Sequence, residues 1–205
     1  GHEVTGSRYA TKAVDPIGID VPGRTDFTRS SCESCHGLTP HPEDNHPKLN
    51  DHTNRVACQT CHIPEFARGG RKTKTWWDWS TAGTSKEMKK DGDGYATFHP
   101  KKGDFVWEAD VVPVYRWFDG EIRYSLLEDA IDPAGVVDIN RFGGTADDPD
   151  ARIWPFKVMQ GRQPYDTGLN ILAVPHLFGK DDTAFWKNFD WDKALKVGMQ
   201  AQGIN

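Results

Sequence analysis

All four cysteines of this chain lie in two short boxes of the same form. The boxes are CESCH at residues 32–36 and CQTCH at residues 58–62, each with two cysteines, a two-residue spacer and a histidine. Three chemistries use cysteine pairs at this spacing: a four-thiolate zinc site, a redox dithiol or pair of disulfides, and covalent attachment of c-type haem.

The histidine that ends both boxes separates these three chemistries. Histidine accounts for 8 of the 205 residues, so a chance match after both boxes has a probability of about 0.2%. A four-thiolate zinc site does not use these histidines, and a redox dithiol is typical of a βαβ setting that the sequence does not show. In a haem c box, each cysteine forms a thioether and the histidine binds iron as the proximal ligand.

The boxes therefore predict two covalently attached haems c. The predicted proximal ligands are His36 and His62, and the predicted thioethers form at Cys32, Cys35, Cys58 and Cys61. A zinc-stapled binding module remains the remote alternative. Composition agrees with haem, because only 37% of the residues are hydrophobic while the chain has 8 tryptophans and 10 phenylalanines. Porphyrins supply apolar surface that aliphatic side chains otherwise provide, and aromatic rings pack on it.

Charge and hydropathy exclude two other classes of function. The net charge is -5 and no basic stripe is present, so the sequence does not predict a nucleic-acid partner. The longest apolar runs are far shorter than the 18 or so residues needed to cross a bilayer, so no membrane span is expected. The chain begins with Gly1, and we expect either a removed leader or an internal piece of a longer protein.

Candidate sixth ligands of the irons come from the remaining histidines. His41 lies between Pro40 and Pro42 in a stiff segment that can place its imidazole on a second haem. We expect one helix from Asn50 or Asp51 to residue 63, on which His52 precedes Cys58 by six positions. That spacing is about 240° of helical rotation, so His52 points away from the haem of its own helix and serves a neighbouring one. His2 is a candidate for a haem outside this chain.

The remaining histidines, His46, His99 and His176, are interpreted as surface residues. A haem with two histidine ligands has no open coordination position and is suited to one-electron transfer. No catalytic residue is therefore assigned in this chain.

The rest of the chain predicts β-structure followed by helices. Asp119-Gly120 predicts a hairpin turn between β-rich flanks, and residues 151–174 suggest further strands. Residues 91–98 are interpreted as a turn, and residues 181–203 as one or two helices with Asp182 as a possible cap. The fold class is mixed and mostly irregular, with short helices around two haems, a β-hairpin-containing region and a C-terminal helical stretch. We divide it into a haem segment, 1–66, and a β-containing insertion with C-terminal helices, 67–205.

The chain also resembles the later half of a known family, the octahaem tetrathionate reductases. The resemblance is carried by these stretches: HEVTGSRYA, CESCHG, LNDHTNRVACQTCHIPEFARGG, TKTWWDWSTAG, KKGDFVWEADVVPVYRWFDG, INRFGG and IWPFKVMQGRQPYD. It implies that the two boxes are the sixth and seventh of eight, and that His2, His41 and His52 match distal ligands. The lysine-ligated catalytic haem of the family is implied upstream, so Lys72, Lys74 and Lys157 receive no such role.

The resemblance implies a periplasmic or extracellular multihaem oxidoreductase to which this chain contributes electron transfer. The alternative is a catalytic role in the full assembly, as a reductase of tetrathionate, nitrite or hydroxylamine. Its expected partners are further haem-bearing segments or chains, and a redox partner cytochrome or quinol-linked donor.

Overall fold

The computed structural model describes residues 32, 36–37, 39–44 and 46–204. The chain forms two compact units, each assembled from segments far apart in sequence. The first unit comprises residues 1–65, 112–123 and 140–156, and the second comprises residues 66–111, 124–139 and 157–205. The functional division after residue 66 stays a prediction.

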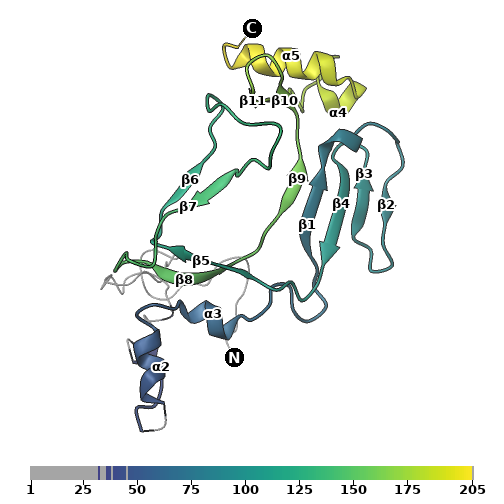
Figure 1. The fold of residues 1–205 in the computed structure, drawn as a ribbon. Helices are drawn as coiled ribbons and strands as arrows, with labels where there is room; N and C mark the ends of the chain where they lie inside the picture. Colours follow the sequence, from purple (N-terminus) through teal and green to yellow (C-terminus); the bar gives the residue numbers. More distant parts are fainter. Residues whose placement is uncertain (1–31, 33–35, 38, 45, 205) are drawn as a thin grey trace. The chain divides into compact units, whose positions relative to one another are not determined.

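Two short helices of the first unit replace the single helix expected over residues 50–63. They are α2 (Pro47–His52) and α3 (Cys58–His62), and Figure 1 shows them as separate coils. The continuous helix was wrong because the linker pairs with a distant strand. Ala57 N donates to Ile153 O at 3.0 Å and Ile153 N donates to Arg55 O at 2.8 Å, which holds the linker extended. Because His52 and Cys58 lie on different helices, the rotation of about 240° expected between them on one helix does not apply.

The strands of the first unit pair differently from the hairpin expected at Asp119-Gly120. Strand β5 (Val114–Phe118) is antiparallel to β8 (Arg152–Phe156), and β6 (Ile122–Tyr124) pairs with β7 (Asn140–Phe142). The hairpin prediction was wrong because the two flanks pair with later strands instead of with each other, while the Asp119 carboxylate accepts a 2.8 Å bond from Glu121 N within the turn. Gly143 allows this, since a Cβ there would lie 2.5 Å from the Asp119 carboxylate.

An aromatic cluster fills one face of the β5–β8 pair. Phe118 is 6% exposed, and its ring meets Phe142, Trp154 and Phe156 nearly at right angles, with centroids 5.5–5.7 Å apart. Edge-to-face contacts of this kind add stabilisation beyond the area that the rings bury. The cluster gives β8 a fixed position, and β8 in turn fixes the linker before α3.

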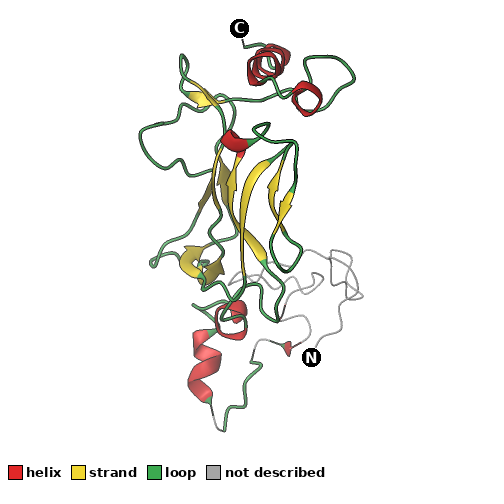
Figure 2. Cartoon of the chain, turned by 90° about the vertical axis from the view of Figure 1, so that its right-hand side faces the viewer, coloured by secondary structure: helices red, strands yellow, loops and turns green. Residues whose placement is uncertain are grey.

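The second unit is built on a five-stranded sheet, whose strands Figure 2 draws as yellow arrows. Its order is β2-β3-β4-β1-β9, antiparallel except for β9, which runs parallel to β1. The bounds of these strands are β1 (Thr73–Asp78), β2 (Lys89–Lys90), β3 (Ala96–His99), β4 (Gly103–Glu108) and β9 (Gln160–Arg162).

The tight junction between β4 and β1 depends on a glycine. Gly103 has φ +83°, and a Cβ there would lie 1.9 Å from Asp78 O. Any side chain at this position would therefore separate the two central strands. The turn expected over residues 91–98 is confirmed for residues 91–94, while Ala96–His99 forms β3.

The C-terminal helices expected from the sequence are confirmed, with a different cap. They are α4 (Phe185–Asn188) and α5 (Trp191–Ala201), preceded by the short strands β10 (Tyr165–Asp166) and β11 (Ile171–Leu172). Asp190, rather than Asp182, caps α5 by accepting from Lys193 N. Asp182 instead lies 3.3 Å from Lys193 Nζ.

A buried cluster joins these helices to the 3-10 turn η1 (Trp79–Thr81). Its centre is Phe185, which is 0% exposed, with Ala82 and Ala194. Partly buried hydrophobic side chains surround it: Trp79, Leu177, Trp186, Phe189 and Trp191. This cluster is the core of the second unit.

Lys72 binds the acidic turn between β2 and β3, which gives the second unit an acid-sensitive contact. Its ammonium lies 2.9 Å from Asp91 and 2.5 Å from Asp93. The hydrogen bond from Lys72 lowers the pKa of Asp91 below its ordinary value of 3.8. A carboxylate with a lowered folded-state pKa stabilises the fold above its unfolded pKa, and this contribution is lost as the pH falls through the folded value.

Replacement of Lys72 by Met is therefore expected to flatten the loss of stability below about pH 4. The measurement is the urea midpoint of the second unit at about pH 5 and about pH 3. Lys90→Met, on the exposed strand β2, is the matched control. An unchanged pH slope in Lys72→Met would show that the ion pairs do not couple to folding.

Candidate haem-binding site

Helix α3 carries the whole of the second box and presents it at the surface of the first unit. Cys58 is partly exposed, whereas Cys61 and His62 are exposed. Thr60 Oγ1 donates to Ile153 O at 2.7 Å, which anchors the helix to β8. Because α3 is one turn with its cysteines at i and i+3, both thiols lie on one face. The helix ends at Ile63, as expected from Pro64.

The first box is only partly described. Cys32 and His36 are in helical conformation, while Cys35 and the candidate ligand His2 lie outside the described residues. Gln59 Nε2 lies 3.9 Å from Cys32 Sγ. Since Gln59 is a spacer residue of the second box, the attachment points of the two boxes are neighbours in space.

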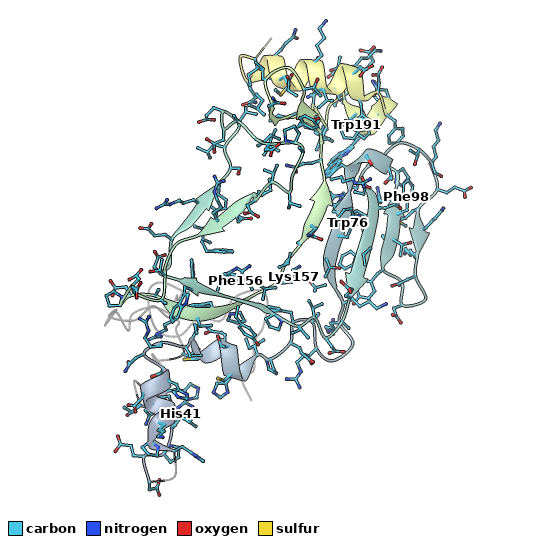
Figure 3. All side chains as sticks on the ribbon, in the orientation of Figure 1. His41, Trp76, Phe98, Phe156, Lys157 and Trp191 are labelled. Carbon is cyan, nitrogen blue, oxygen red and sulfur yellow. The ribbon has the colours of Figure 1, made fainter. Side chains whose placement is uncertain are left out.

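His41 and His62 face each other as a pair of nearly parallel imidazoles. Their ring centroids are 6.3 Å apart and their planes differ by 7°. Two metal–imidazole bonds of about 2.0 Å separate the ligating nitrogens by about 4 Å and the ring centres by about 6 Å. The centroid separation in this structure is close to that value. Figure 3 labels His41 beside α2.

Asn50 holds His41 in this position. His41 N donates to Asn50 Oδ1 at 3.0 Å, and Asn50 Nδ2 donates to His41 O at 2.9 Å. His41 Nδ1 is buried without a hydrogen-bond partner among the described residues. The sequence suggested Asn50 only as a helix cap, and nothing in the sequence marked Gln59, because box spacers accept many residue types.

The other histidines lie in different surroundings. His52 is exposed in the last turn of α2, and His46 is exposed immediately before that helix. His99 Nδ1 accepts from Lys101 N at 3.1 Å, and burial, with the charges of Lys102 and Lys101, lowers its pKa.

His176 Nε2 lies 3.6 Å from Asp181 Oδ2. His99 and His176 are thus engaged by neighbours in the second unit.

The described residues hold neither a metal-binding cluster nor a membrane-spanning helix. In that part of the chain, no three or more His, Cys, Asp or Glu side chains form a group that could hold a metal ion. Cys35, the fourth thiolate of the zinc alternative, is outside it. Within the same residues, no helix is long and apolar enough to cross a membrane.

Comparison with known proteins places the chain among cytochromes. The family model described as bacterial cytochrome c matches residues 74–205. The crystal structure of octaheme cytochrome c from Shewanella oneidensis superimposes with a TM-score of 0.77 at 41% identity. The match covers 90% of this chain and 42% of that protein, so this chain spans less than half of the octaheme relative. No curated protein matches.

These matches bear on the expectations from the sequence. The resemblance to octahaem cytochromes is confirmed, and so is a mixed fold with few helices and many strands. Both matches support c-type haem and haem-based electron transfer. The family model covers well over half of the sequence, and the chain belongs to the family of bacterial cytochromes c.

Proposed function

We propose that this chain transfers electrons through two covalently bound haems c, as part of a multihaem periplasmic oxidoreductase. The observation that carries the proposal is the pair of parallel imidazoles, His41 and His62, at the separation one iron requires. When bound, haem supplies one-electron chemistry at its iron. A haem held by two histidines would have no open coordination position, so His41 and His62 suit one-electron transfer rather than substrate binding.

We assign the following residues to the second haem site. Cys58 and Cys61 would form the thioethers, His62 would be the proximal ligand and His41 the distal ligand. The side chain of Asn50 makes two hydrogen bonds to the backbone of His41, which fix the position of this residue beside α2. Partners that position a metal ligand contribute to metal affinity, and their loss weakens it.

The first haem is attached at Cys32 and Cys35, with His36 as its proximal ligand. His52 and His2 are proposed as distal ligands for haems other than the one at His62, with His2 serving a haem outside this chain. The contact between Gln59 and Cys32 supports direct transfer between the two haems. Haems attached at both boxes would have their porphyrin edges close together, because the attachment points are neighbours.

The whole protein is proposed to be larger than this chain. The octaheme relative is more than twice as long as the matched part, which supports further haem-bearing segments as partners. Reduction of a sulfur or nitrogen oxy-compound, such as tetrathionate, nitrite or hydroxylamine, is assigned to haems elsewhere in that assembly. A cytochrome or quinol-linked donor in the periplasm or outside the cell is the proposed source of electrons.

The test of the proposed function is the haem content and spin state of the haem-loaded chain. We expect c-type bands in the pyridine haemochrome spectrum and two haems by intact mass. The electron paramagnetic resonance spectrum is expected to be low-spin for the His62 haem, unchanged by cyanide or nitrite. Zinc in place of c-type bands would support the zinc-stapled module. A high-spin signal that responds to nitrite and disappears in a His62 variant would place the reaction in this chain.

A further inference from the structure

Two arginines lie opposite each other on the two-stranded ribbon formed by β6 and β7. These strands form a sheet of their own, and Figure 1 shows their arrows side by side. Gly143 N donates to Glu121 O at 3.0 Å, which sets the register of the ribbon at one end. Two residues further along both strands, Arg123 is directly opposite Arg141.

The same register continues beyond the arginine pair, so the pairing is defined from both sides. Ser125 N donates to Ile139 O at 3.0 Å, again two residues further along each strand. Directly opposite residues of an antiparallel pair project to the same face, with their Cβ atoms about 5 Å apart. Arg123 and Arg141 are both exposed. The ribbon therefore carries two guanidinium groups side by side on one face.

The opposite face of the ribbon packs on the aromatic cluster of the first unit. Phe142 follows Arg141 along β7, and its ring centroid lies 4.0 Å from that of Phe156 and 5.6 Å from that of Phe118. Neighbouring residues of a strand point to opposite faces. The packing of Phe142 thus turns both arginines away from the cluster and fixes the strand that carries one of them.

The charge of the arginine pair is not neutralised by the part of the chain that the structure describes. There, neither guanidinium group has a hydrogen bond or an ion pair with a carboxylate. The Asp119 carboxylate lies beside Gly143 on the same face, but it accepts its 2.8 Å bond from Glu121 N. Like charges directly opposite each other destabilise an antiparallel pair. A ligand with two negative groups would remove this repulsion.

We propose that Arg123 and Arg141 bind the two propionate groups of a haem that is carried by a further haem-bearing segment. This inference rests on the proposed function, which names such segments as partners. More than half of the octaheme relative lies outside the matched part. The two propionates of a haem leave one edge of the porphyrin side by side, as the two guanidinium groups leave the ribbon. Each guanidinium is a planar fork of N–H donors that fits one carboxylate.

Phenylglyoxal labelling of arginines in the haem-loaded chain tests the site, with mesohaem as the probe. Two imidazoles occupy the axial positions of the probe, so a protein histidine cannot hold it. The propionate diamide of mesohaem, which has no carboxylates, is the control. Peptide mass spectrometry quantifies each arginine, and Arg116, exposed on β5, reports non-specific effects. At about twice its Kd, the probe is expected to lower the labelling of Arg123 and Arg141 about three-fold.

Arg141→Gln is the matched variant, since it removes one guanidinium group and leaves Arg123 as the reporter. Protection of Arg123 that saturates with mesohaem, is absent with the diamide and is lost in Arg141→Gln supports the proposal. Equal protection by the diamide overturns it, because the porphyrin surface and not the propionates would then bind. Protection that persists in Arg141→Gln, or no protection at any mesohaem concentration, also overturns it.

The labelling without probe excludes an occupant from the chain itself. Arg123 and Arg141 are expected to label as readily as Arg116 before mesohaem is added. Slower labelling of both would overturn the proposal, because a group of this chain would already neutralise them. Failure of the proposed function is seen separately, as missing c-type bands in the spectrum of the chain.

Discussion

Replacing His41 with Met is expected to raise the reduction potential of one haem while both haems remain attached. The substitution leaves the proposed thioether positions Cys58 and Cys61 and the proposed proximal ligand His62 unchanged, so haem content is expected to be preserved. A thioether ligand favours reduced iron more than an imidazole does. The rise is expected to be on the order of 0.1 V, a fraction of the roughly 0.8 V that axial ligands span. Spectroelectrochemical titration of the haem-loaded chain measures it.

The control for this prediction is His46→Met, because His46 is exposed and lies five residues beyond His41 in the same segment. Its titration curve is expected to match the wild type. Asn50→Ala is expected to act in the same direction as His41→Met but less strongly, since it removes the two bonds that orient His41. If His41→Met left every haem potential and the low-spin spectrum unchanged, His41 would not be an iron ligand.

Phe185→Ala is expected to destabilise the second unit by about 3–5 kcal/mol, because it leaves a cavity in a packed core. Phe185 is 0% exposed, and its ring lies 3.9 Å from that of Trp191 and 5.8 Å from that of Phe189. For a protein of this size the loss lowers the melting temperature by roughly 6–20 °C. Calorimetry measures this shift, and hydrogen exchange of the α5 amides locates it.

Phe178→Ala is the matched control, since Phe178 is 80% exposed in the segment before α4. Its effect is expected to stay within about 0.5 kcal/mol. The haem potentials are expected to be the same in both variants, because the core around Phe185 belongs to the second unit. Similar melting temperatures for Phe185→Ala and Phe178→Ala would contradict the assignment of Phe185 to the core.

The sequence predicted the c-type haem of this chain better than it predicted the course of the backbone. The boxes at residues 32–36 and 58–62 predict haem attachment from local spacing alone, because two thiols and a histidine at this spacing lie within about one helical turn. The break between α2 and α3 was not predictable, because it depends on Ile153, which lies far away in sequence. The same holds for Asp119-Gly120, where the approach of Gly143 decides the pairing of the strands.

For the candidate distal ligands too, the sequence predicted the residues better than their surroundings. The two prolines around His41 predicted a stiff segment aimed at a second haem, and the structure places that ring opposite His62. Which residue would fasten His41 could not be predicted, because the side chain of Asn50 is equally suited to capping a helix. For His52, the predicted orientation of the side chain relative to Cys58 assumed one continuous helix. Because the linker between α2 and α3 is extended, helical periodicity does not relate the two residues.

The anchoring of α3 on β8 has a consequence for the order of events during biogenesis. Thr60 and Ile153 are 93 residues apart, so the second box cannot reach its final place until that later strand has been synthesised. Contacts between distant residues form late in folding, after the loop between them has closed. A chain that ends before Ile153 therefore cannot hold α3 in the position described here, even though the box at residues 58–62 is already complete in its sequence.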